Sequence, residues 1–178
     1  MITEQLLRKT TAEQVKRIYR RFFSDYPTPQ KLARAPLSEL RSAIRPLGIE
    51  YNRSKALKEL ARYVVKTYGG RVPLVKDELL SIPHVGDYAA SSVMTISAGR
   101  ASPMVDRNVA RVFSRIFGLP IHNNERRNVA TVTELLSSRF YGLLSAQFSY
   151  AILDFAALVC KAKRPECKTC LFNADCVF

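Results

Sequence analysis

The sequence predicts an all-α protein. Apolar residues recur at helical spacing in several segments, prolines and glycines separate these segments, and no pair of segments alternates like neighbouring strands. With 178 residues, of which 47% are apolar, the chain can form one ordinary domain or two small ones around a real core. It contains no internal repeat and no low-complexity linker.

Two helices are predicted within the first 25 residues. The first is expected to end around Arg8 to Thr10. The second begins where Thr10 and Thr11 stand three residues before Glu13 and Gln14, which is the spacing of a capping box. Its apolar stripe consists of Val15, Ile18, Tyr19, Phe22 and Phe23.

Two later segments have the same helical periodicity and end at glycines. The stripe before Gly69 and Gly70 consists of Leu57, Leu60, Ala61, Val64, Val65 and Tyr68. The stripe before Gly118 consists of Val109, Val112, Phe113, Ile116 and Phe117. Another face of this helix is predicted to be basic, because it carries Arg107, Arg111 and Arg115. Shorter helices are expected over 29–35, 37–44, 75–81, 86–99, 124–140 and 142–160.

The chain carries a large excess of positive charge. It has 28 Lys and Arg against 15 Asp and Glu, a net charge of +13. Solubility alone needs a net charge of only about 2 to 8 in a small domain, so a polyanion such as double-stranded DNA is the expected partner. No apolar run predicts a membrane span, and the N-terminus lacks the layout of a signal peptide. We therefore expect a monomeric, cytoplasmic protein associated with the nucleoid and not with a membrane.

All four cysteines lie within 17 residues in the pattern C-x6-C-x2-C-x5-C; they are Cys160, Cys167, Cys170 and Cys176. Disulfides are disfavoured in the cytoplasm, where thiols stay reduced. Zinc sites of four cysteines usually use two short pairs, and only one is present, whereas iron-sulfur clusters also take four cysteines with short mixed gaps. The spacing favours a 4Fe-4S cluster and leaves zinc as the alternative. A bound cluster would fix a basic loop suited to phosphates, formed by Lys161, Lys163, Arg164 and Lys168.

The stretch LLSIPHVGDYAASSVM predicts a helix end, a tight turn and a new helix. The turn consists of Pro83, His84, Val85 and Gly86. Free N–H groups at the start of the second helix can hold a DNA phosphate without reading sequence. A plain connection between helices has the same pattern, so the turn alone does not decide between the two.

Asp106 directly precedes the periodic helix that ends at Gly118. One interpretation is structural, because Asp is a favoured N-cap residue. The other is catalytic: the positive end of a helix stabilises an ionised carboxylate, which a developing cationic sugar requires. The two roles are compatible.

Together, IPHVGDYAA, MVDRNVARVF and the cysteine pattern resemble the helix-hairpin-helix DNA glycosylases, which include endonuclease III and adenine DNA glycosylase. The resemblance covers nearly the whole chain and keeps the order and spacing of all three features. It implies two helical domains with DNA bound in the cleft between them. Residues 1–100 would form a six-helix domain with the hairpin, and residues 101–178 a domain with a 4Fe-4S cluster.

The resemblance also implies the chemistry. The catalytic aspartate of the family matches Asp106. Bifunctional members carry a lysine two residues after the last hairpin glycine, and its amine attacks the sugar. This chain has Tyr88 there, which cannot form a Schiff base, so a monofunctional glycosylase without lyase activity is expected. Glu4 falls where relatives place an active-site glutamate, and with Tyr88 it would line the base pocket.

The thymine-DNA mismatch glycosylase branch resembles this chain further, in ITEQLLRKTTAEQVKRIY, in LKELARYVVKTYGGRVP and in the tyrosine at the lysine position. Its members remove thymine or uracil opposite guanine, mismatches that arise when 5-methylcytosine or cytosine deaminates. Two alternatives are adenine removal opposite 8-oxoguanine and a non-catalytic module that binds DNA damage.

Further DNA contacts follow from the same resemblance. Relatives insert a side chain into the DNA stack at the position of Arg8, and a second wedge lies near Tyr51 or Asn52. Plain surface residues are the alternative interpretation at these positions, as for Glu4. His84 replaces the first glycine of the usual hairpin, which tests whether the turn accepts a Cβ atom; its imidazole either contacts a phosphate or is a spectator.

Overall fold

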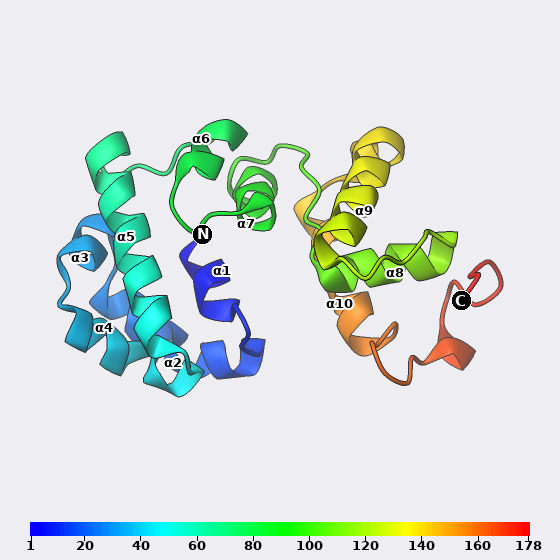
Figure 1. Ribbon diagram of the computed structural model, residues 1–178, viewed down its shortest axis with the longest axis horizontal. Coiled ribbons are helices and arrows are strands. Elements are labelled where there is room, and N and C mark those ends of the chain that lie inside the picture. Colours follow the sequence, from blue (N-terminus) through cyan, green and yellow to red (C-terminus); the bar gives the residue numbers. More distant parts are fainter. The chain divides into compact units, whose positions relative to one another are not determined.

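The computed structural model describes all 178 residues and contains helices and loops without any strand. The predicted all-α class is therefore confirmed. The chain divides into two compact units, Met1–Ala90 and Ser91–Phe178 (Figure 1). The predicted domain boundary after residue 100 and the DNA-binding cleft stay predictions. None of the helices has the length and apolar character needed to cross a membrane.

The first unit contains six complete helices and a 3₁₀ turn. They are α1 (Ile2–Leu7), α2 (Ala12–Asp25), α3 (Pro29–Arg34), α4 (Leu37–Ile44), η1 (Arg45–Leu47), α5 (Glu50–Tyr68) and α6 (Lys76–Ser81). The start of α7 (Asp87–Ser92) follows after the predicted hairpin turn. These bounds agree with the predicted helices to within a few residues, with two exceptions. Helix α1 ends at Leu7, before the predicted end at Arg8 to Thr10, and α5 begins at Glu50, before the first residue of its predicted stripe, Leu57.

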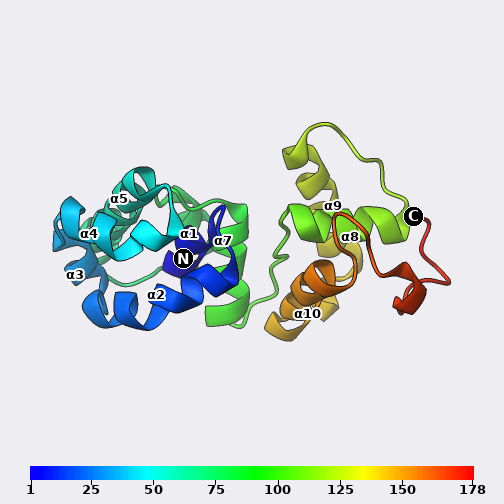
Figure 2. The ribbon, with the colours of Figure 1, turned by 90° about the horizontal axis from the view of Figure 1, so that it is seen from below.

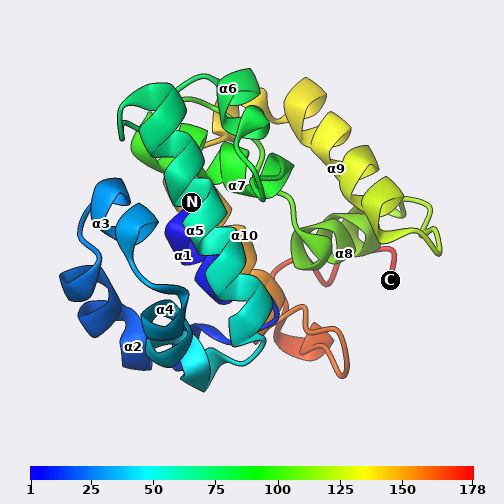
Figure 3. The same ribbon diagram turned by 60° about the vertical axis from the view of Figure 1, so that its left-hand side comes forward.

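The long helix α5 organises the first unit, since it packs against α1, α3 and α4 (Figure 3). The stripe predicted for this helix is its buried face: Leu57, Leu60, Ala61 and Val64 are at most 2% exposed. Of the stripe predicted for α2, three residues are buried, Val15, Ile18 and Phe22.

The ends of these helices follow the sequence signals. The capping box at α2 is made by Thr11 and Gln14, whose side chain and backbone groups bond reciprocally. Thr10 instead donates its hydroxyl to the carbonyl of Leu47 at 3.2 Å. Helix α5 ends as predicted at Gly69, whose left-handed conformation (φ 63°) terminates the helix.

The segment after the hairpin departs from a regular helix. A single helix was expected over 86–99, but α7 continues as a π-helical segment, η2 (Val93–Ser97). Buried hydroxyls close this region: Thr95 Oγ1 donates to the carbonyl of Ser102 at 2.7 Å, and Ser102 Oγ donates to Ser91 Oγ at 2.9 Å. These bonds satisfy polar groups that would otherwise be buried without partners.

The second unit is built on α8, which packs against α9 and α10 (Figure 2). After η2, its elements are α8 (Arg107–Phe117), α9 (Glu125–Arg139), η3 (Tyr141–Leu143), α10 (Ala146–Leu158) and η4 (Cys167–Thr169). Val109, Val112 and Phe113 from the predicted stripe of α8 are buried, whereas Phe117 is 47% exposed. From Val159 to Phe178 the only helical turn is η4, so the cysteine-bearing segment is mostly loop.

Arg53, in the first turns of α5, is the polar centre of the first unit. It is only 4% exposed. Its guanidinium donates to five oxygen atoms: the carbonyls of Gln5, Arg8, Leu47 and Gly48 and the hydroxyl of Thr10. Burial, and to a lesser degree the neighbouring Arg8, lowers the pKa of Arg53. This side chain therefore joins the end of α1, the turn after η1 and the start of α5.

Replacing Arg53 with methionine keeps an apolar stem but removes every donor. Because buried carbonyls would lose their partners, we expect the free energy of unfolding to fall by about 3 kcal/mol in urea denaturation. The control is Arg62→Met, the same change at an exposed position of α5, for which about 0.5 kcal/mol or less is expected. Equal losses in the two variants would contradict the role assigned to Arg53.

Candidate functional site

The hairpin turn lies between α6 and α7. Val85 donates its backbone N–H to the carbonyl of Ile82 at 3.1 Å, and the N–H of Ala90 bonds the carbonyl of Gly86 at 2.9 Å as α7 begins. Val85 is buried at 7% exposure, Pro83 is half-buried, and Gly86 is exposed. His84 has a left-handed backbone, with φ 66°, so the turn accepts the Cβ atom of this residue.

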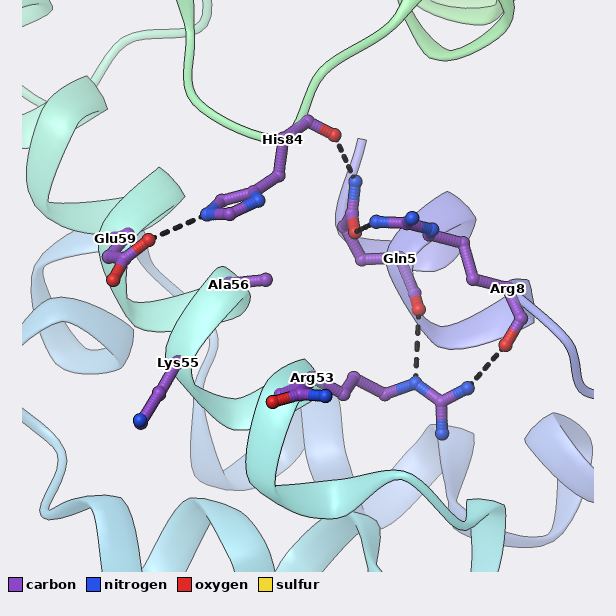
Figure 4. A pocket seen from close by; sticks show the side chains of 8 residues that line it. Gln5, Arg8, Arg53, Lys55, Ala56, Glu59 and His84 are labelled. Carbon is purple, nitrogen blue, oxygen red and sulfur yellow. Dashed lines mark hydrogen bonds and ion pairs between the residues drawn. The ribbon is translucent and has the colours of Figure 1, made fainter.

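His84 is held from two sides (Figure 4). The side-chain amide of Gln5, on α1, donates from Nε2 to the carbonyl of His84 at 2.6 Å. The imidazole Nε2 of His84 lies 2.6 Å from the carboxylate Oε2 of Glu59, on α5. The imidazole therefore has a partner within the protein, and the choice between a phosphate contact and a spectator stays a prediction.

A pocket of about 350 Å³ opens beside this turn (Figure 4). Its lining includes Gln5, Arg8, Asn52, Arg53, Lys55 and His84. Three of the residues predicted to contact DNA, Arg8, Asn52 and His84, are thus brought together on the first unit. Arg8 is exposed, and its Nη1 donates to Gln5 Oε1 at 3.3 Å.

The residue before α5 and the first turn of α5 expose apolar side chains. Tyr51, predicted near a wedge, is 62% exposed, and the guanidinium of Arg41 lies 4.5 Å from the centroid of its ring. Ile49 is 49% exposed and has a left-handed backbone, with φ 45°. Such a conformation is unusual for a β-branched residue, and residues in strained conformations cluster at functional sites. Sequence reasoning missed Ile49 as an individual residue, although an isolated Ile directly after Gly48 was the available signal.

Asp106 is the N-cap of α8, as one interpretation predicted. Its Oδ1 accepts the backbone N–H groups of Asn108 and Val109, each at 2.8 Å, and its Oδ2 accepts Nδ2 of Asn108, also at 2.8 Å. All three bonds are donated to the carboxylate, and they engage both of its oxygens. The cap therefore fixes the orientation of the carboxylate as well as the start of the helix.

A bonded path runs from Asp106 to the first cysteine. Asn108 donates to Asp106 and accepts at Oδ1 from Nη1 of Arg111 at 2.9 Å. Arg111 then donates to the carbonyl of Cys160 from Nη2 at 3.0 Å and from Nε at 3.2 Å. It also donates to the carbonyl of Ala156 at 3.0 Å. Burial is the main cause that lowers the pKa of Arg111.

Arg115 connects α8 to the cysteine-bearing segment. Its Nη1 lies 3.5 Å from the sulfur of Cys160 and 2.8 Å from the carbonyl of Lys161. The Sγ of Cys176 donates to the Arg115 carbonyl at 3.4 Å, and the Arg115 guanidinium lies 4.1 Å from the ring centroid of Phe178. Two of the three arginines predicted to form a basic face of α8 are thus bonded within the chain.

The basic residues predicted around the cysteines differ in their surroundings. Lys161 donates to Glu166 at 2.9 Å, and this hydrogen bond lowers the pKa of Glu166. Lys163, Arg164 and Lys168 are exposed. Arg164 has φ 53°, in the left-handed region.

The four cysteines carry free thiols on one short segment, and none forms a disulfide. No three Cys, His, Asp or Glu side chains converge closely enough to hold one metal ion. Four thiols on one short segment, of which Cys160 lies beside the cationic Arg115, are a donor set that suits a metal with thiolate ligands.

Tyr88 and Glu4 both belong to the first unit. Tyr88 is the second residue of α7, directly after the turn, and Glu4 lies on α1 one residue before Gln5. Both side chains are half-buried. Their assignment to a base pocket stays a prediction.

Comparison with known proteins agrees with these features. Residues 2–137 match the model of the HhH-GPD superfamily base excision DNA repair protein. The thymine/uracil-DNA glycosylase of Pyrobaculum aerophilum is 41% identical over 184 aligned residues, which span 100% of this chain and 79% of that protein. The solved structure of a thermostable thymine-DNA glycosylase superposes with a TM-score of 0.91 at 38% identity, covering 98% of this chain and 80% of that one.

A further match is an endonuclease III in non-covalent complex with DNA, with a TM-score of 0.85 at 26% identity over 98% of this chain and 80% of that one. The resemblance inferred from the hairpin, Asp106 and the cysteines is therefore confirmed. The chain belongs to the HhH-GPD superfamily of base excision DNA repair proteins.

Proposed function

We propose that this protein is a monofunctional DNA glycosylase that removes thymine or uracil mispaired with guanine. The observation that carries the proposal is the carboxylate of Asp106, which three N–H groups hold in one orientation. The similarity to thymine/uracil-DNA glycosylases over the whole chain supports the substrate. The partner is double-stranded DNA that contains the mismatch.

Asp106 would act on the sugar of the target nucleotide. As the bond to the base breaks, positive charge develops on the sugar, and an oriented carboxylate stabilises that charge electrostatically. Its helix cap means that little reorganisation is needed during the reaction. The same carboxylate would orient the attacking water.

Tyr88 and Glu4 would line the pocket that receives the base. Flipping a nucleotide out of the duplex costs a few kcal/mol, and the cost is lower for a mispaired base. Mispairing therefore supplies part of the selectivity. Hydrogen bonds from these two side chains to the base or to a water would ease the departure of the pyrimidine as an anion.

The contacts to DNA would come from three places. Free N–H groups at the start of α7 would bind a phosphate, and Lys163, Arg164 and Lys168 are exposed for further phosphates. Arg8 would enter the space that the flipped base leaves. Ile49 would act beside it as an apolar wedge, because it is exposed on a strained loop that Arg53 holds through the Gly48 carbonyl.

The cofactor would be a 4Fe-4S cluster held by Cys160, Cys167, Cys170 and Cys176. It would supply no chemistry to base release and would serve as a structural clip for the basic loop. The basic surroundings of the thiols suit a cluster with thiolate ligands, because Arg115 donates toward Cys160. Arg111 and Arg115 would hold the first ligand in place through its backbone and sulfur.

Asp106→Asn separates the two roles of this residue. Asn is as good an N-cap as Asp, so the two bonds to backbone N–H groups and α8 should be preserved. The charge that stabilises the sugar is lost, together with the bond from Nδ2 of Asn108, which should lower the free energy of unfolding by about 1 kcal/mol. We expect base release in single-turnover assays to fall by about a thousandfold or more, with DNA affinity changed by less than about threefold. Asp106→Ala is the companion variant that also removes the cap; turnover retained by Asp106→Asn would exclude the catalytic role.

Duplexes with G/T, G/U and A/8-oxoguanine pairs test the substrate and the absence of lyase activity. Because Tyr88 stands in place of an amine nucleophile, strand cleavage at T or U should appear only after alkali, and borohydride should trap no covalent adduct. Cleavage without alkali together with trapping would contradict the monofunctional assignment. Release of adenine alone would identify an adenine glycosylase, and no release from any duplex would favour a module that only binds damage.

Metal analysis tests the cofactor. The purified protein should be brown and contain about four iron and four sulfide per chain. Cys167→Ser should lower the iron content and the affinity for DNA, because the basic loop loses its anchor. A colourless protein that contains zinc in place of iron after purification without air would contradict the assignment of a 4Fe-4S cluster.

A further inference from the structure

The turn that would bind DNA depends on a side chain outside it. A residue with a Cβ atom rarely adopts the left-handed backbone of His84 (φ 66°). Glycine would adopt it freely, whereas here two other helices hold the residue. Gln5 from α1 fixes its carbonyl at 2.6 Å, and Glu59 from α5 fixes its imidazole at 2.6 Å (Figure 4).

Gln5 is buried, with 4% exposure, although its type is usually found at the surface. Both ends of its amide are used. Nε2 must face the carbonyl of His84, because a carbonyl only accepts, and Oε1 must face Arg8, because a guanidinium only donates. The orientation of the amide is therefore set by its two partners.

One amide thus connects two features that would contact DNA at different points. On one side is the turn that presents N–H groups to a phosphate; on the other is the Arg8 guanidinium, 3.3 Å from Gln5 Oε1. The backbone of Gln5 is itself fixed, since its carbonyl accepts from Nε of Arg53 at 3.2 Å. A displacement of the turn would therefore move Gln5 Oε1, the acceptor that positions Arg8. A displacement of Arg8 would likewise move Gln5 Nε2, the donor that holds the turn.

We propose that Gln5 is a positioning residue that couples the hairpin turn to Arg8, so that phosphate binding and insertion into the DNA stack occur together. The inference rests on the proposed function, which assigns Arg8 to the space that the flipped base leaves in the DNA stack. The coupling itself concerns the free protein and its binding to DNA, and both can be measured without base release.

Two variants of Gln5 separate its hydrogen bond to the turn from its hydrogen bond to Arg8. Gln5→Met removes both hydrogen bonds from a residue of similar length. Gln5→Glu keeps an acceptor for Arg8 but loses the donor to the His84 carbonyl. The matched control is Gln30→Met, because Gln30 also donates its amide to a backbone carbonyl, that of Gly69 at 3.3 Å, at the surface and away from the turn.

Hydrogen exchange of residues 82–90 in the free protein reports on the turn. We expect exchange about fivefold faster in Gln5→Met and Gln5→Glu, as the loss of one hydrogen bond implies, and unchanged in Gln30→Met. Binding is then measured to an undamaged duplex and to one with an abasic-site analogue opposite guanine. Gln5→Met should weaken both by about fivefold.

Combination with Arg8→Ala tests the coupling. In the wild type and in Gln5→Glu, adding Arg8→Ala should weaken binding to the abasic duplex. In Gln5→Met, Arg8 has already lost the acceptor that positions it, so adding Arg8→Ala should weaken binding by less than about twofold. Exchange and binding of both Gln5 variants within twofold of the wild type would overturn the proposal, as would an equal effect of Arg8→Ala in all backgrounds. A wild type that binds DNA but releases neither thymine nor uracil would overturn the proposed function instead, and the exchange result would still stand.

Discussion

Backbone carbonyls at the ends of helices need donors, and in both units buried or half-buried arginines supply them. The last carbonyls of a helix have no partner within it. Arg53 bonds carbonyls within and just after α1 and η1, whereas Arg111 and Arg115 bond carbonyls at the end of α10 and just after it. The segments tied in this way carry Arg8, Ile49 and the first cysteine. Part of the net charge of +13 is therefore structural, and the remaining exposed arginines and lysines are the ones available to a polyanion.

The same constraint ties the proposed catalytic group to the cysteine-bearing loop. Asp106, Asn108, Arg111 and Cys160 form one bonded path, in which every donor meets an acceptor. Such networks are rigid because each member fixes the next. A loop with little regular structure of its own is thus held against α8, and the orientation of the carboxylate and the position of the loop depend on the same arginine.

Local signals predicted much of this fold. The capping box at Thr11, the glycines at 69 and 118 and the apolar stripes gave the helices nearly to their ends, because these signals act within one or two turns. The family, the turn and the cap at Asp106 were also predictable from sequence. The π-helical segment after α7 was not, since its buried hydroxyls reach Ser102 across a loop. The roles of Gln5, Arg53 and Glu59 depend on partners 25 to 79 residues away, which periodicity cannot reveal.

The N-cap at Asp106 also has a genetic consequence. Aspartate and asparagine codons differ by one G·C to A·T transition, and asparagine caps a helix as well as aspartate does. Selection on folding alone would therefore not remove that change, and a cell that carried it would make a stable protein that occupies mismatches without clearing them. Deamination of the cytosine paired with that guanine is the lesion that starts this transition. If it removes uracil or thymine opposite guanine as proposed, the protein would repair this lesion in its own gene and so preserve the Asp106 codon.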